Sequence, residues 1–222
     1  MIDDSVATGE ITLYLRSLLP QQDPFITTLS QKALEEYIPV VPPEEAQLIC
    51  TLFAALKPKN VLEIGTAIGY SSIIFSRSLD DDAHITTVEI DGDLAQTARK
   101  NIKTDGREEK IDVICGNALD VLDRLFEENR RFDCIFLDAA KGQYINFFEK
   151  CMRLLNAGGV LLSDNVLYRG SVAKEGFIPR KHRTIIRNLK EYLNILSTDS
   201  RLRTSVLPIG DGLAVSVKIS KE

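Results

Sequence analysis

The sequence contains few of the residues that bind soft metals or form disulfides. It has two histidines among 222 residues, and they stand far apart in the chain, at His84 and His182. The scarcity of histidine therefore disfavours a histidine-rich metal site and a Ser-His-Asp triad. The four cysteines form no C-x-x-C pair, and each lies in an apolar stretch: Cys50, Cys115, Cys134 and Cys151. This is typical of small buried thiols in a reducing cytoplasm, so any metal would be bound by oxygen.

Long apolar runs are also absent. No run approaches the roughly 18–20 residues that a membrane-spanning helix needs. The N-terminus, Met1 to Asp4, is acidic where a secretory signal would be basic. We therefore expect no membrane span and a cytoplasmic location. A length of 222 residues predicts one domain, with N-terminal helices over 1–57 and the core over 58–222.

Apolar periodicity predicts an α/β fold from residue 60 onward. The predicted strands are 60–64, 83–89, 110–114, 132–138, 157–164, 201–208 and 213–219, and the helices between them are 70–79, 91–104, 118–128, 143–154 and 180–197. The segment 208–212 is too short for a helix and contains the Asp-Gly pair of a tight turn, so the last two strands must be antiparallel. A seven-stranded, mostly parallel sheet with a C-terminal antiparallel hairpin is the Rossmann-like arrangement of class I methyltransferases. Extra N-terminal helices are predicted at 8–20, 25–37 and 43–56.

A glycine-containing loop follows the first predicted strand. Gly65 and Gly69 have the spacing G-x-x-x-G, whereas dinucleotide-binding domains use G-x-G-x-x-G. The loop therefore fits the methionine end of S-adenosylmethionine better than a pyrophosphate, with Ser71 placed to bind its carboxylate. Glu89, at the end of the second strand, is placed to bind both ribose hydroxyls, and Asn117 to contact adenine. Alternatively, Glu89 is a solvated strand end and Asn117 only a helix N-cap.

Oxygen-bearing side chains follow the fourth and fifth strands. Asp138 ends one, and Asp164 and Asn165 end the next. Carboxyl ends of neighbouring strands meet at the cofactor crevice, so these three side chains should lie together and suit Mg²⁺ or another hard divalent cation. Lys141 lies close enough to accept a substrate proton. The alternatives are loop caps for the two aspartates and a charge-balancing surface role for the lysine.

Four segments carry a family resemblance: Glu63–Ser71, Asp138–Tyr144, Asp164–Leu167 and Gly210–Ala214. They resemble the catechol and caffeoyl-CoA O-methyltransferase family over roughly residues 25–219. The resemblance implies an S-adenosylmethionine-dependent O-methyltransferase, with Lys141 and Asp138 catalytic and Asp138, Asp164 and Asn165 binding the metal. It also implies a homodimer. The implied cofactor-binding residues are Val41, Glu63, Gly65, Ser71, Glu89, Asn117, Ala118 and Asp138.

The charge distribution bears on the substrate. The chain has a net charge of −5, yet residues 169–187 contain six basic residues and one acid, Glu175. Segment 164–173 and this basic stretch most resemble family members that methylate 5-hydroxyuridine at the tRNA wobble position, giving 5-methoxyuridine. The candidate RNA-binding residues, for contact with a tRNA anticodon loop, are Arg169, Arg180, Lys181 and Arg183.

Two other functions remain open from the sequence. The first is the same chemistry on a small catechol or phenol, which the net acidity favours but which the absence of tryptophan around a catechol ring disfavours. The second is a non-catalytic or nicotinamide-binding module, which the glycine spacing and the Asp/Asp-Asn trio disfavour.

Overall fold

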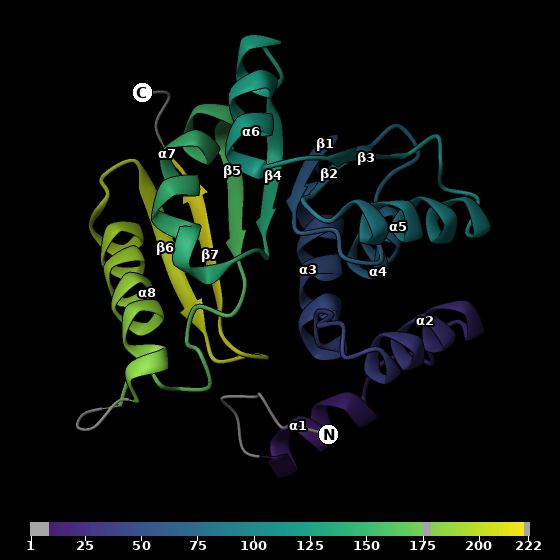
Figure 1. Cartoon of the computed structure of the whole chain (residues 1–222), viewed down its shortest axis with the longest axis horizontal. Coiled ribbons are helices and arrows are strands. Elements are labelled where there is room, and N and C mark those ends of the chain that lie inside the picture. The colour runs from purple at the N-terminus through teal and green to yellow at the C-terminus, as the bar shows by residue number, and fades with distance from the viewer. Residues whose placement is uncertain (1–8, 175–178, 220–222) are drawn as a thin grey trace.

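The computed structural model describes residues 9–174 and 179–219, which form a central sheet covered by helices on both faces (Figure 1). The sheet has seven strands in the order β3-β2-β1-β4-β5-β7-β6. Their bounds are β1 Asn60–Ile64, β2 His84–Glu89, β3 Ile111–Cys115, β4 Phe132–Leu137, β5 Leu155–Ser163, β6 Leu202–Leu207 and β7 Leu213–Lys218. The first five strands are parallel, and β7 is antiparallel to both β5 and β6. The predicted class I methyltransferase architecture is confirmed.

The helices cover the two faces of the sheet separately (Figure 1). Helices α2, α3, α4 and α5 pack on one face, and α6, α7 and α8 on the other. Their bounds are α2 Pro24–Glu35, α3 Pro43–Leu56, α4 Tyr70–Ser78, α5 Gly92–Thr104, α6 Ala118–Glu127, α7 Tyr144–Leu154 and α8 Arg180–Thr198. Strand side chains alternate between the two cores, so Cys134 and Phe136 face α3 and α4, whereas Ile135 and Leu137 face α7.

The N-terminal helix α1, Gly9–Ser17, is shorter than the helix predicted over 8–20. Thr8 lies outside the described residues, and the helix ends before Pro20, which disfavours helical backbone in the preceding residue. The Arg16 guanidinium attaches α1 to α3 by donating to Glu44, at 2.7 Å from Nε. Ile11, Leu15 and Leu18 are exposed, so the apolar face of α1 does not pack on the sheet.

The four cysteine side chains differ in burial. All four thiols are free, as predicted, but Cys115 at the end of β3 is exposed and only Cys134 and Cys151 are fully buried. The expectation that every cysteine is buried was therefore wrong, because β3 is an edge strand with half-covered side chains.

No helix within residues 9–174 and 179–219 is both long and apolar enough to cross a membrane.

Candidate functional site

The glycine loop between β1 and α4 lies directly against the end of β4. Gly65 has a φ of 109°, and a Cβ at this position would collide with the carbonyl oxygen of Asp138. Its amide donates to the carbonyl of Val88 on β2, at 2.9 Å. The loop thus joins the carboxyl ends of three parallel strands. Gly69, with φ 81°, then begins α4 without a side-chain cap, so the first amides of the helix have no protein side chain at the cap position.

Glu63 lies beneath this loop and is fully buried. Hydroxyl groups of Ser71, Ser72 and Thr87 donate to its carboxylate, with 2.5 Å from Ser71 and 2.6 Å from Thr87. Burial raises the pKa of Glu63 to about 7, against the lowering effect of the three hydroxyls. Glu63 and Ser71 are both predicted cofactor contacts, and here the Ser71 hydroxyl donates to the Glu63 carboxylate.

The other predicted cofactor residues lie around the same edge of the sheet. Glu89 is nearly buried, and its carboxylate accepts from the amides of Ala67, at 2.8 Å, and Asp91, at 3.0 Å. Asn117 is an N-cap, accepting from the amide of Leu119 at 2.9 Å, which is the alternative considered for it. Ala118 is the first residue of α6, and Val41 is a buried residue at the wall of a large cavity.

Carboxylates gather where β4 and β5 end. Asp138 and Asp164 affect each other electrostatically, and burial followed by the charge of Asp138 raises the pKa of Asp164 to about 7. Burial also raises the pKa of Asp138, which the charge of Lys141 opposes. Lys141 Nζ lies 3.8 Å from Asp138 Oδ1. Asn165, with φ 55°, follows Asp164 and reaches the cavity wall beside Lys141.

A buried tyrosine fixes the relative position of these strand ends. The hydroxyl of Tyr144 lies 3.0 Å from the carbonyl oxygen of Asp164 and 3.3 Å from that of Leu137, and donates toward both. Tyr144 is the first residue of α7 and is fully buried. The two segments predicted to bind a metal are therefore held together by a side chain that the sequence places only within a motif.

Glu45 is the residue of this site that the sequence did not reveal. It lies in the first turn of α3 and is fully buried. Its carboxyl group lies against that of Asp164, and no cationic side chain of the described residues forms an ion pair with it. Burial and the charge of Asp164 raise its pKa well above the ordinary value. Its neighbour Glu44 instead pairs with Arg16. The sequence signal, two acids after Pro42-Pro43, predicts a helix start. It cannot tell which of these two buried acids pairs with an arginine and which lies beside Asp164.

A cavity of about 1210 Å³ opens at this edge of the sheet. Lys141, Asn165 and Arg169 line it, together with apolar residues of the N-terminal region and of α8. Tyr168 and His182 form part of the wall and are hydrogen-bonded at 2.8 Å. The cavity therefore joins the carboxylate cluster to a mixed apolar and polar wall.

The predicted RNA-binding residues lie at or near this cavity. Arg169 lines it, and its amide donates to the carboxylate of Asp211. Arg180, Lys181 and Arg183 are exposed in the first turn of α8. Glu175, the one acid counted in the basic stretch, lies outside the described residues.

The predicted metal ligands are all oxygen donors. Within the described ranges, no group of three or more His, Cys, Asp or Glu residues is arranged to hold a metal ion. The predicted set contains two carboxylates and the amide oxygen of Asn165. Glu45 supplies a third buried carboxyl group beside Asp164. Such a cluster requires protons or a cation, so its donor set fits a hard divalent ion.

Known proteins resemble this chain along most of its length. A family model described as O-methyltransferase matches residues 20–219. A caffeoyl-CoA O-methyltransferase of Stellaria longipes is 34% identical over 178 residues, covering 77% of this chain and 73% of its own. A Staphylococcus aureus structure, provisionally named a caffeoyl-CoA O-methyltransferase, has a TM-score of 0.87 and 37% identity, covering 94% of this chain and 99% of its own. An O-methyltransferase of Bacillus cereus in complex with SAH has a TM-score of 0.83 and 26% identity, covering 94% and 97%.

Proposed function

Because this chain belongs to the O-methyltransferase family and is an S-adenosylmethionine-dependent enzyme of the caffeoyl-CoA type, we propose that it methylates a hydroxyl of a small catechol or phenolic substrate with the help of Mg²⁺. The observation that carries the proposal is the cavity of about 1210 Å³ where Lys141 and Asn165 meet an apolar wall. This volume slightly exceeds the roughly 300–1,000 Å³ of many small-molecule sites, which leaves room for a phenolic ring and a group attached to it.

S-adenosylmethionine supplies an electrophilic methyl group when it is bound. The glycine loop would hold its amino-acid end through the amides at the start of α4, for which Gly65 and Gly69 give close backbone approach. Glu89 would bind the ribose hydroxyls, in addition to the two amides that already orient its carboxylate. Glu63 would contribute indirectly, because its carboxylate accepts from the Ser71 hydroxyl and so fixes the position of that hydroxyl beside the cofactor. Val41, Asn117, Ala118 and Asp138 complete the proposed cofactor surface.

Asp138, Asp164 and Asn165 would hold the divalent cation, and Tyr144 keeps their two strands in register. The cation would make a substrate hydroxyl easier to deprotonate near neutral pH. Lys141 would accept that proton. Its Nζ lies 3.8 Å from Asp138 Oδ1 and borders the cavity, so it can reach a substrate atom beside the carboxylates.

The apolar wall and the named relatives both favour a phenolic substrate. Val41, Tyr70 and Ile186 contribute apolar surface to the cavity, which would cover an aromatic ring. The basic residues Arg169 and Lys174 at the same cavity would contact an anionic group attached to the ring, such as a carboxylate or an acyl carrier phosphate.

A tRNA substrate is the second candidate, supported by one observation. Arg180, Lys181 and Arg183 extend the basic border of the cavity along the exposed start of α8. Phosphate contacts there would position an extruded anticodon base, 5-hydroxyuridine, toward Lys141. Two of the three relatives named above are called after caffeoyl-CoA, which supports the phenolic candidate more than this one.

Transfer of labelled methyl groups would test both candidates. Caffeoyl-CoA, caffeic acid, catechol and tRNA carrying 5-hydroxyuridine would each be incubated with enzyme, with Mg²⁺ or with EDTA. We expect label in a phenolic substrate only when Mg²⁺ is present. Label in tRNA alone would overturn the phenolic assignment, and equal transfer in EDTA would overturn the role of the cation. Cytoplasmic location and a homodimer stay predictions from the sequence.

A further inference from the structure

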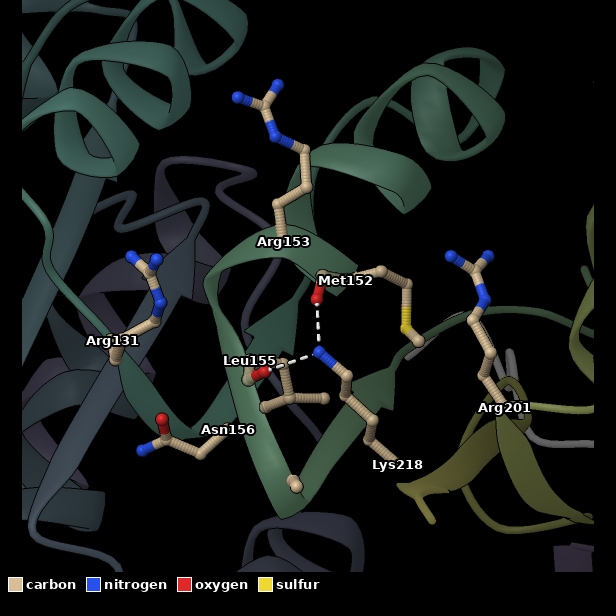
Figure 2. A pocket seen from close by; sticks show the side chains of 8 residues that line it. Arg131, Met152, Arg153, Leu155, Asn156, Arg201 and Lys218 are labelled. Atoms are coloured by element: carbon tan, nitrogen blue, oxygen red, sulfur yellow. Dashed lines mark hydrogen bonds between the residues drawn. The ribbon is translucent and has the colours of Figure 1, made fainter. Parts of the chain in front are cut away.

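A second cavity lies at the opposite edge of the sheet from the glycine loop. It has a volume of about 480 Å³ and is lined by Arg131, Met152, Arg153, Leu155, Asn156, Ala157, Arg201 and Lys218 (Figure 2). Four of these eight residues are cationic and none is acidic. In a chain with a net charge of −5, this concentration of positive charge in a cavity requires an explanation.

The sheet topology brings these cations together from distant parts of the sequence. Arg131 immediately precedes β4, and Arg201 immediately precedes β6. Arg153 lies in the last turn of α7, which leads directly into β5. Lys218 ends β7, which is antiparallel to β5, so its last residue lies where β5 begins. All four therefore reach the amino-terminal edge of the parallel strands, whereas the carboxylate cluster lies at the carboxyl edge.

Lys218 is the centre of the cavity and is largely buried, with 8% of its surface exposed. Its Nζ donates to the carbonyls of Met152, at 2.7 Å, and Leu155, at 2.8 Å (Figure 2). An ammonium has three donors, so these two bonds leave one proton free for another acceptor. Burial, and then the charges of Arg201 and Arg131, lower the pKa of Lys218. An anion beside Lys218 would compensate each of these effects.

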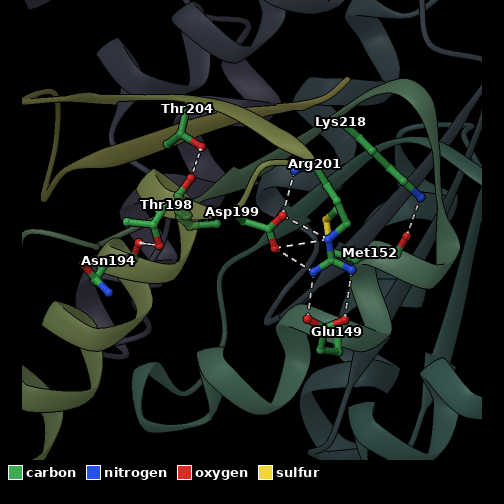
Figure 3. A network of polar contacts seen from close by, with 9 residues as sticks. Glu149, Met152, Asn194, Thr198, Asp199, Arg201, Thr204 and Lys218 are labelled. Atoms are coloured by element: carbon green, nitrogen blue, oxygen red, sulfur yellow. Dashed lines mark hydrogen bonds and ion pairs between the residues drawn. The ribbon is translucent and has the colours of Figure 1, made fainter. Parts of the chain in front are cut away.

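The three arginines of the cavity differ in how many of their N–H groups already have a partner. Arg201 is occupied by Asp199 and Glu149, with contacts of 2.6 Å and 2.8 Å from Nη2, and these two carboxylates compensate its charge (Figure 3). Arg131 and Arg153 instead lie over the ring of Phe126, with 5.0 Å and 3.8 Å from the guanidinium carbon to the ring centre. Arg153 lies 4.0 Å from the carboxylate of Asp123, beyond hydrogen-bonding distance. Arg131 Nη1 also donates to the carbonyl of Arg130, at 2.8 Å. A guanidinium has five donors, so both groups are held in place with donors left for a ligand.

Capping of α7 by Lys218 accounts for one of these cations, because a lysine at a helix C-terminus satisfies carbonyls that lack partners. It accounts for neither Arg131 nor Arg153. We propose that this cavity is a second ligand site, which binds the phosphate group of a small phosphorylated molecule between Lys218, Arg131 and Arg153. Phosphate presents several acceptor oxygens that match guanidinium forks and a lysine point charge, and the volume lies within the range of small-molecule sites.

Binding of pyrophosphate to the full-length protein, measured by calorimetry at constant ionic strength, would test the site. Inorganic phosphate and AMP serve as further phosphate probes, and citrate as a carboxylate probe of similar charge. The test variant is Arg131→Gln/Arg153→Gln, which leaves Lys218 and the cap of α7 in place. Arg124→Gln is the matched control, since Arg124 is an exposed arginine of α6 outside the cavity. Lys174→Gln controls for binding at the large cavity.

We expect binding at one site per chain, weakened at least about tenfold by the double substitution and unchanged by either control variant. Loss of binding in Lys174→Gln would assign the anion to the large cavity and overturn the proposal. Equal affinity of the double variant and the parent, or no binding at millimolar pyrophosphate, would also overturn it. Tighter binding of citrate than of pyrophosphate would contradict the phosphate assignment. Melting temperatures of all variants without ligand would show that each remains folded.

Discussion

Replacing Glu63 by glutamine should change how the stability of this protein depends on pH. Glu63 is fully buried, and desolvation raises its pKa from the ordinary 4.5 to about 7. Between these values the folded protein holds a proton on Glu63 that the unfolded chain has lost. The free energy of unfolding therefore falls as the pH rises through this window, and this effect stops above about pH 7.

The size of the effect follows from the same values. Each pH unit within the window changes the free energy of unfolding by about 1.4 kcal/mol per proton. From pH 5 to pH 8, ionisation of Glu63 should thus cost the wild-type protein about 2 to 3 kcal/mol, an order-of-magnitude figure for a fully buried group. Glu63→Gln carries no titratable group there, so it escapes this loss. Hydrogen bonds lost to Ser72 and Thr87 add a destabilisation that does not depend on pH.

The assay is urea unfolding followed by circular dichroism at several pH values between 5 and 8, at constant ionic strength and without cofactor. Subtracting the wild-type free energy from that of Glu63→Gln removes the titration of groups that do not interact with Glu63, which leaves Glu63 itself and its electrostatic effect on Asp138. We expect the difference to rise by about 2 to 3 kcal/mol across this range in favour of the variant. Ser72→Ala provides a second test, since removal of a donor should raise the pKa of Glu63 further and extend the window upward. A difference that stays constant would refute the reasoning, because it would mean that Glu63 is already ionised in the folded protein at pH 5.

Three further predictions concern the site. Asp164→Ala should lower Mg²⁺-dependent turnover by about 100-fold or more, since even residues that only orient metal ligands contribute roughly 10–100-fold; SAH affinity, measured by calorimetry, should persist, and equal loss of both would contradict this division of roles. Gly210→Ala should lower the melting temperature more than Gly106→Ala. Both positions have positive φ, which costs alanine about 1–2 kcal/mol, but only at position 210 would the new Cβ also collide with Glu45. Charge reversal at Arg180, Lys181 and Arg183 should weaken tRNA binding steeply and catechol turnover little. Unchanged tRNA affinity in a filter-binding assay would remove the argument for an RNA surface.

The order and type of the core elements were predictable from the sequence because each depends on local patterns. Apolar alternation and glycine punctuation placed the seven strands within about two residues of their observed ends. The short Asp-Gly connection at 208–212 required the antiparallel hairpin that β6 and β7 form. Asp138, Asp164 and Asn165 could be predicted together because parallel strands bring their carboxyl ends to one edge.

Other features depend on contacts between distant segments, which local patterns do not encode. Glu44 and Glu45 are adjacent acids in one helix turn, yet packing pairs the first with Arg16 and buries the second beside Asp164. The cations of the second cavity come from four separate parts of the chain, and Lys218 joins the others because β7 runs antiparallel to β5. The sequence by itself determined the elements and which side chains stand at the strand ends, since these follow from periodicity and chain direction. Only the tertiary structure decided which charges are buried and what they face, because burial is a property of the packed layers.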